Sequence, residues 1–139
     1  MNQEPKPLNI VLIGAGAIAR KAYLPLLRTW PGIRIAGLYS RTRETVDRMC
    51  RDWQIDYGTT DLDAVLALQP DAAFVLTSTT SHDELTRRIL DAGVDVYLEK
   101  PATISSAQTL ALAEQADAAG RVLMVGFNRR YAPLYQQAK

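Results

Sequence analysis

The chain has 139 residues, a formal net charge of +1, and 47% hydrophobic and 22% charged residues. This length suits one domain with a single core, and the near-neutral charge gives no general attraction to nucleic acid or anionic membranes. No run of about 18 apolar residues is present that could span a membrane. One cysteine, Cys50, and one histidine leave no internal disulfide and no zinc site. We therefore expect a cytoplasmic globular domain without a metal, in which Cys50 is an ordinary half-buried thiol.

Segments of strand length alternate with segments of helical period along the chain. Residues 1–7 are polar and proline-rich, and we expect a disordered leader there. The apolar patterns predict strands over 8–13, 33–39, 55–60, 72–77, 94–98 and 122–126. They predict helices over 17–28, 43–53, 61–68, 81–92 and 105–119, with another beginning in the tail after residue 127. Nearly continuous apolar strands joined by helices indicate an α/β fold, a doubly wound parallel sheet forming a single domain.

Two helix starts carry capping signals. Thr60, followed three residues later by Asp63, is expected to cap the short third helix. Ser81 and Glu84 have the spacing of a capping box at the start of the next helix. We expect that helix to end at Gly93.

A glycine-rich loop follows the first predicted strand and opens the first helix. In "IGAGAIA" the pattern is G-x-G-x-x-A, made by Gly14, Gly16 and Ala19. Gly14 permits a tight turn, Gly16 lets a pyrophosphate approach the backbone, and Ala19 keeps the helix close to the sheet. Ala17 and Ile18 add the N–H groups of the helix start, which attract an anion. Small residues also pack helices on sheets, but the strand–loop–helix context favours a bound dinucleotide.

The end of the second strand bears on the choice of dinucleotide. The segment "GLYSRTRE" has no carboxylate at the position where an NAD site takes the ribose hydroxyls. Arg41 instead suits a 2′-phosphate, which offers several acceptor oxygens and about two negative charges, and Ser40 and Thr42 can add hydroxyl donors. Alternatively, Thr42 caps the following helix, and Arg41 and Arg43 are solvated. We favour NADP(H) over NAD(H).

Polar residues also follow two later strands. Thr77 and Ser78 come at the carboxyl end of one predicted strand, and Glu99 and Lys100 at the end of the next. Ligands bind at this edge in parallel sheets. The alternative is an ordinary strand exit with solvated charges, stopped by Pro101.

Four segments together resemble a known family. "GAGAIA", "TSTTSH", "AGVDVYLEKPAT" and "LMVGFNRRYAP" are similar, in order and spacing, to the Gfo/Idh/MocA oxidoreductases and to an MviM-like branch of them. The resemblance covers essentially the whole chain, although "TSTTSH" departs from the family's T-P-N. It implies a Rossmann domain binding NAD(P) over 8–130, with 131–139 starting a connection to a second α/β domain that the chain lacks.

The resemblance assigns chemistry to Lys100. In the family this lysine contacts the substrate oxygen and the nicotinamide ribose, and it helps proton transfer. A frequent cis bond before Pro101 is expected to aim it inward. The family's further catalytic histidine comes from the second domain, because the only histidine of this chain is His82.

Other cofactor contacts are implied by the same resemblance. Glu99 would line the nicotinamide side, and His82 would lie near the cofactor, although a place in the first turn of a helix explains it equally well. Asn128 and Arg130 match the segment beside the nicotinamide or substrate, and Arg129 is expected to be a surface charge only.

The expected function is a cofactor-binding domain of an NAD(P)-dependent oxidoreductase acting on CH–OH groups of a sugar, inositol or similar polyol. The isolated chain is expected to turn over poorly, and any homo-oligomer would form through the missing domain. The alternative is a non-catalytic nucleotide-binding or regulatory module, or a subunit completed by a partner chain.

Overall fold

A six-stranded parallel sheet forms the centre of the protein, in the order β3-β2-β1-β4-β5-β6. The computed structural model describes residues 6–137, so residues 1–5 of the expected leader lie outside the described residues. The strands are β1 Leu8–Ile13, β2 Ile33–Tyr39, β3 Gly58–Thr59, β4 Ala72–Val75, β5 Asp95–Leu98 and β6 Leu123–Val125. The helices are α1 Leu24–Leu27, α2 Arg43–Trp53, α3 Leu62–Leu66, α4 His82–Asp91, α5 Ser106–Ala119 and α6 Pro133–Gln137. This strand order confirms the doubly wound sheet predicted from the sequence.

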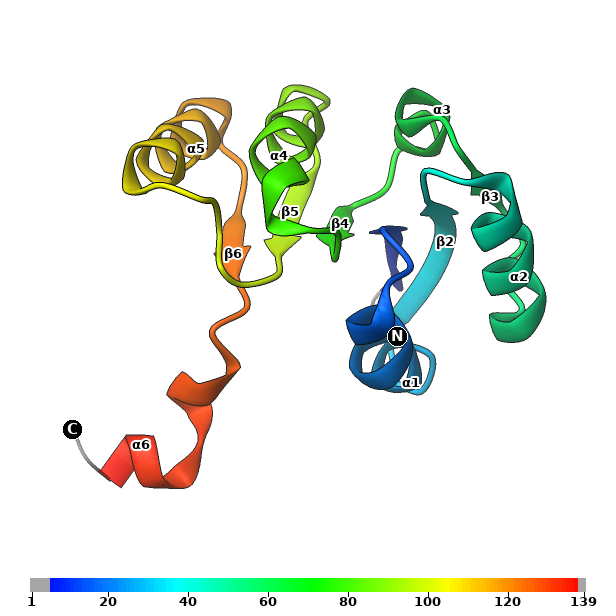
Figure 1. Ribbon diagram of the computed structural model, residues 1–139, viewed down its shortest axis with the longest axis horizontal. Helices are drawn as coiled ribbons and strands as arrows, with labels where there is room; N and C mark the ends of the chain where they lie inside the picture. Colours follow the sequence, from blue (N-terminus) through cyan, green and yellow to red (C-terminus); the bar gives the residue numbers. More distant parts are fainter. Residues whose placement is uncertain (1–5, 138–139) are drawn as a thin grey trace, which may run out of the picture.

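Helices cover both faces of the sheet. Figure 1 shows α3, α4 and α5 on one face, and α1 and α2 on the other. The central strand β1 is buried on both sides, because Val11 and Ile13 pack into the core under α3–α5 while Ile10 and Leu12 pack under α1 and α2. A strand enclosed in this way needs the nearly continuous apolar run that the sequence shows.

The strands adjacent to β1 align their carboxyl ends at one edge of the sheet. β1 pairs with β4 in parallel from Ile10–Ala72 to Ile13–Val75, and its pairing with β2 shifts register once, after Ile10. Residues that follow these strands are therefore brought together, although they are far apart in the sequence.

The first helix departs from the regular helix predicted over 17–28. It begins at residue 17, and a π-helical turn over Ala19–Tyr23 precedes α1, with the Leu24 N–H donating to the Ala19 carbonyl. Pro25 lies at the start of α1. Because proline has no N–H to give to the carbonyl four residues back, a widened turn before it is a reasonable local solution.

Three general expectations from the sequence concern Cys50, membrane-spanning segments and metal ions. Cys50 is half-buried on α2, and burial, reinforced by Asp47, raises the pKa of its thiol. Within residues 6–137, no helix is long and apolar enough to cross a membrane. Among residues 6–137, no three or more His, Cys, Asp or Glu side chains lie close enough together to hold a metal ion.

The start of α4 differs from the predicted capping box. The Ser81 hydroxyl lies 2.9 Å from the Thr77 hydroxyl and 2.8 Å from the Ser78 carbonyl, and makes no capping bond to a helix N–H. A short 3₁₀ turn over Thr79–Ser81 precedes the helix and directs this hydroxyl back toward β4. The predicted helix end is confirmed, because Gly93 follows α4 with φ +74°.

The predicted cap of α3 is wrong by one residue. Asp61 is the capping residue, and its carboxylate accepts a bond of 2.9 Å from the Asp63 N–H. Thr60 is exposed and precedes the cap. Asp61 takes the role because its extended backbone places the carboxylate over the free N–H groups of the first turn.

This assignment gives a testable difference between neighbouring residues. Asp61→Ala is expected to lower the free energy of unfolding by about 1 kcal/mol, because one N–H of α3 loses its acceptor. Thr60→Ala serves as the matched control, with an expected change below about 0.5 kcal/mol. Urea unfolding followed by circular dichroism measures both, and a larger loss in the Thr60 variant would contradict the assignment.

Candidate functional site

Polar and small residues from five strands meet at the carboxyl edge of the sheet. Along the strand order, the segments are 40–41 after β2, 14–19 after β1, 77–78 after β4, 99–100 after β5, and residue 128 after β6. The structure thus places every segment singled out in the sequence on one edge.

A cavity of about 720 Å³ occupies the first part of this edge. Of the predicted residues, it is lined by Gly14, Gly16, Ala17, Ile18, Ser40, Arg41, Thr77 and Ser78. Ala19 is fully buried in the core beside β1, which agrees with its predicted packing role. Glu99, Lys100, His82, Asn128 and Arg130 do not line this cavity.

The two glycines of the loop meet different surroundings. Gly14 has φ +104°, and a Cβ there would lie 2.8 Å from Thr77 Cγ2 and 3.1 Å from the carbonyl of Leu76. A Cβ on Gly16 would have only the Leu76 oxygen nearby, at 4.0 Å, so this residue faces open space at the cavity. The first helix begins directly after Gly16, and Ala17 and Ile18 of its first turn, where helix N–H groups have no partner within the helix, line the cavity. The loop therefore fits the diphosphate of a dinucleotide.

Two arginines follow β2 closely in the sequence, one at the cavity and the other on the surface of α2. Arg41 lines the cavity, whereas Arg43 pairs with Asp47 at 3.7 Å on α2. Thr42 precedes α2, but its hydroxyl donates to Thr45 Oγ1 at 2.9 Å and caps no N–H. Of these two arginines, Arg41 alone lines the cavity.

Sequence analysis missed further residues of the cavity wall, namely Arg20, Thr45, Arg48, Glu84 and Arg88. Arg88 is paired with Asp63 at 2.6 Å. Thr45 and Arg48 lie three residues apart on α2 and share one face of that helix. This helical spacing, counted from the second strand end, is the signal that could have found them.

His82 connects two strand ends without reaching the cavity. It is 1% exposed, with Nδ1 3.0 Å from the Pro101 carbonyl and 3.2 Å from the Ala102 carbonyl. Its Nε2 lies 3.2 Å from the Thr77 carbonyl. The ring therefore joins the end of β4 to the segment that follows Lys100. The sequence left two interpretations of His82, a place near the cofactor or a place in the first turn of a helix. The structure agrees with the second, because His82 is the buried first residue of α4.

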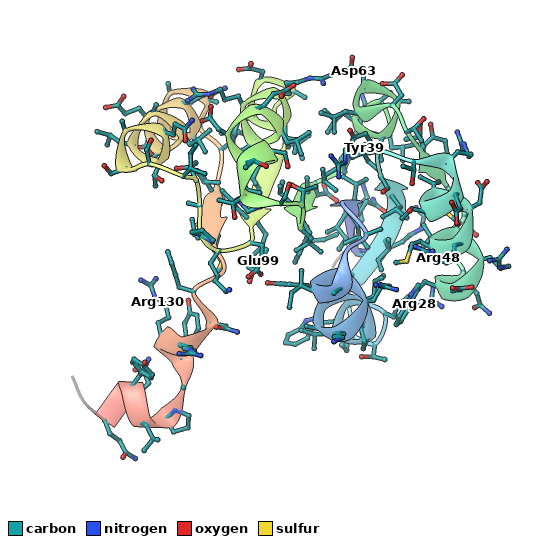
Figure 2. The ribbon with its side chains drawn as sticks, in the orientation of Figure 1. Arg28, Tyr39, Arg48, Asp63, Glu99 and Arg130 are labelled. Atoms are coloured by element: carbon teal, nitrogen blue, oxygen red, sulfur yellow. The ribbon has the colours of Figure 1, made fainter. Side chains whose placement is uncertain are left out.

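Glu99 is held by the first helix. The residue is 9% exposed, and its carboxylate accepts a hydrogen bond from the Tyr23 hydroxyl, which also lies 3.1 Å from the Tyr97 hydroxyl. Burial, followed by the bond to Glu99, raises the pKa of Tyr23, so this hydroxyl stays protonated and donates. The Tyr97 ring stacks on Phe74 with centroids 4.8 Å apart. Figure 2 shows Glu99 beyond the end of β5, on the side of the first helix.

Lys100 is exposed at a second, smaller cavity. This cavity has a volume of about 310 Å³ and is lined by Lys100, Phe127, Asn128 and Arg129. The bond from Lys100 to Pro101 is cis. Arg129, expected to be a surface charge only, lines the cavity, while Arg130 does not. Figure 2 shows Arg130 on the segment that leads from β6 to α6.

Comparison with known proteins identifies the family. Residues 8–127 match the Gfo/Idh/MocA family model, described as an oxidoreductase family with an NAD-binding Rossmann fold. The chain belongs to the Gfo/Idh/MocA oxidoreductase family. YceM of Salmonella typhimurium is 40% identical over 96% of this chain and 43% of its own length. Inositol 2-dehydrogenase of Gluconacetobacter diazotrophicus is 33% identical over 95% of this chain and 40% of its own length.

Several solved structures share the fold of this chain. An oxidoreductase of this family from Vibrio cholerae has 35% identity and a TM-score of 0.86, covering 94% of this chain and 42% of the relative. A 3-ketoreductase from Actinomadura kijaniata, in complex with NADP, has 27% identity and a TM-score of 0.86 over 96% of this chain and 42% of the relative. GenD2 from gentamicin A biosynthesis, in complex with NAD, has 25% identity and a TM-score of 0.88 over 99% of this chain and 39% of the relative. The chain thus spans about 40% of the length of its relatives, and these include both NAD and NADP complexes.

The contrast between the two glycines is testable. Gly14→Ala is expected to lower the free energy of unfolding by about 2–4 kcal/mol, because it adds backbone strain and a clash with β4. Gly16→Ala is the matched control, with an expected change below about 1 kcal/mol. Urea denaturation of both variants provides the measurement. Equal stability of the two variants would show that Gly14 is not pressed against the end of β4.

Proposed function

We propose that this chain is the cofactor-binding domain of an NADP(H)-dependent oxidoreductase that moves a hydride to or from the CH–OH carbon of a sugar, inositol or similar polyol. The observation that carries the proposal is the cavity at the carboxyl edge. The glycine loop after β1 lines it, and so do Ser40 and Arg41, which follow β2 where no carboxylate ends the strand. The polyol class is supported by inositol dehydrogenases among the relatives.

Binding is assigned to the loop and to the end of β2. The N–H groups of Gly16, Ala17 and Ile18 donate to the diphosphate, and the dipole of the first helix adds a favourable field. Arg41 binds a 2′-phosphate through its planar guanidinium, and Ser40 adds a hydroxyl donor. Thr77 and Ser78 follow the next strand and contact the ribose on the nicotinamide side. The nicotinamide, when bound, supplies the hydride chemistry.

The chemical role falls to Lys100. This side chain is exposed at the edge, beside Asn128, and donates a hydrogen bond to the reacting oxygen of the substrate. It stabilises negative charge that develops on this oxygen and passes a proton to or from it. His82 and Glu99 keep the backbone on either side of Lys100 in place through their hydrogen bonds. A purely sensory module would not require an exposed lysine here.

The decisive experiment is a calorimetric titration of the chain with NADPH and, separately, with NADH. We expect NADPH to bind at least about tenfold more tightly, because the 2′-phosphate adds charge-assisted hydrogen bonds. Arg41→Ala is expected to remove most of this preference. Arg43→Ala is the matched control, because Arg43 pairs with Asp47 and does not line the cavity. Equal losses of NADPH and NADH affinity in the Arg41 variant would contradict the 2′-phosphate assignment, and no binding of either dinucleotide would contradict the proposed function.

Lys100 can be tested separately from binding. Lys100→Ala is expected to leave NADPH affinity within about threefold, because no diphosphate or 2′-phosphate contact is lost. In a protein that carries this domain together with a substrate domain, the same change is expected to lower turnover by about a hundredfold or more. NADPH oxidation or NADP reduction with a panel of polyols and sugars measures turnover. Unchanged turnover in the alanine variant would remove Lys100 from the mechanism.

A further inference from the structure

Among the described residues 6–137, one of the three arginines of α2 has no carboxylate partner, and this arginine lines the cavity. The three arginines of α2 are Arg43, Arg48 and Arg51. Arg43 pairs with Asp47, and Arg51 lies 3.5 Å from Asp52. Arg48 is half-buried, and within residues 6–137 its Nε is buried without any hydrogen-bond partner. Within the same residues Arg48 also has no carboxylate partner, so the chain does not compensate its positive charge at the cavity that it lines. A charge left in this state favours an anion supplied from outside the chain.

The position of Arg48 on α2 directs it to the end of β2. Side chains on a helix tilt toward its N-terminus, and α2 starts directly after the segment that contains Ser40 and Arg41. Arg48 lies one helical turn below Thr45, on the same face. All four of these residues line the 720 Å³ cavity. Figure 2 labels Arg48 between α2 and the first helix, on the inner side of α2.

The charged residues on the side of the cavity formed by the first helix and α2 favour an anion. Arg20, Arg41 and Arg48 line the cavity on the side of the first helix and α2, while its one acidic lining residue, Glu84, comes from α4, as does Arg88. Arg88 is already paired with Asp63, outside the cavity lining. The uncompensated positive charge therefore lies at the adenosine end of the proposed dinucleotide. A 2′-hydroxyl would leave it unmatched, whereas a 2′-phosphate brings about two negative charges and three acceptor oxygens.

We propose that Arg48 is a specificity-determining residue for the dinucleotide, and that its guanidinium binds the 2′-phosphate together with Arg41. This inference rests on the proposed function, since it takes the 720 Å³ cavity to be a dinucleotide site. Arg41 approaches the phosphate from the loop after β2, and Arg48 approaches it from α2. Two guanidinium groups from different elements hold a phosphate in a defined orientation, which one exposed arginine alone does not.

The test compares ligands that differ only in the 2′-phosphate. Wild type, Arg48→Gln and Arg51→Gln are titrated with adenosine 2′,5′-bisphosphate and adenosine 5′-monophosphate, and then with NADPH and NADH. We expect Arg48→Gln to lower the affinity for adenosine 2′,5′-bisphosphate and for NADPH by about tenfold or more. The affinity for adenosine 5′-monophosphate and for NADH is expected to fall by less than about twofold. Arg51→Gln, on the exposed side of the same helix, is expected to change none of the affinities. Arg48→Lys keeps the charge without the planar fork and is expected to show a partial loss.

The outcomes separate this inference from the proposed function. In the first outcome, wild type binds the dinucleotides while Arg48→Gln lowers the affinities for NADPH and NADH equally, or lowers neither. Arg48 is then not a specificity residue, and the proposed function stands. A wild type that prefers NADH also overturns the inference. A wild type that binds neither dinucleotide overturns both. Thermal unfolding of each variant confirms that it is folded, and the Arg48→Lys variant provides the decision if Arg48→Gln does not fold.

Discussion

The close approach of the chain at Gly14 to the end of β4 is the constraint on which the site depends. β1 lies between β2 and β4, so the chain leaving β1 must turn within the narrow space beside Leu76 and Thr77. A residue without a side chain and with a positive φ makes this turn possible. The turn carries the chain into the first helix and presents the N–H groups of that helix to the cavity. The anion site is thus a consequence of how the central strand ends.

A second part of the edge depends on buried hydrogen bonds rather than on a tight turn. His82 joins the end of β4 to the segment after Lys100, and the Tyr23 hydroxyl joins Glu99 to the first helix. A buried polar side chain that is hydrogen-bonded helps to define one arrangement of the elements that it contacts. These bonds hold the backbone before and after Lys100 while its own side chain stays exposed. The residues that position the lysine are therefore distinct from those that line the dinucleotide cavity.

Local charge matters more here than the overall charge of the chain. The net charge of +1 predicts no attraction to anions in general. The fold nevertheless gathers Arg41 and Arg48 at one end of a cavity, while Arg43 and Arg88 are paired with carboxylates outside its lining. A local excess of positive charge thus arises at this end of the cavity, although the chain as a whole is nearly neutral.

The sequence by itself determined the order of strands and helices, the parallel sheet, and the glycine loop, because apolar periodicity and turn chemistry act over a few neighbouring residues. It predicted β1, β2 and α2 with the bounds that the structure shows. Only the tertiary structure decided which buried polar groups meet, such as Tyr23 with Glu99, 76 residues apart, and His82 with Pro101, 19 residues apart. It also turned Arg48 toward the cavity and Arg51 away from it. Such partners follow from the packing of whole elements against one another, which no local pattern encodes.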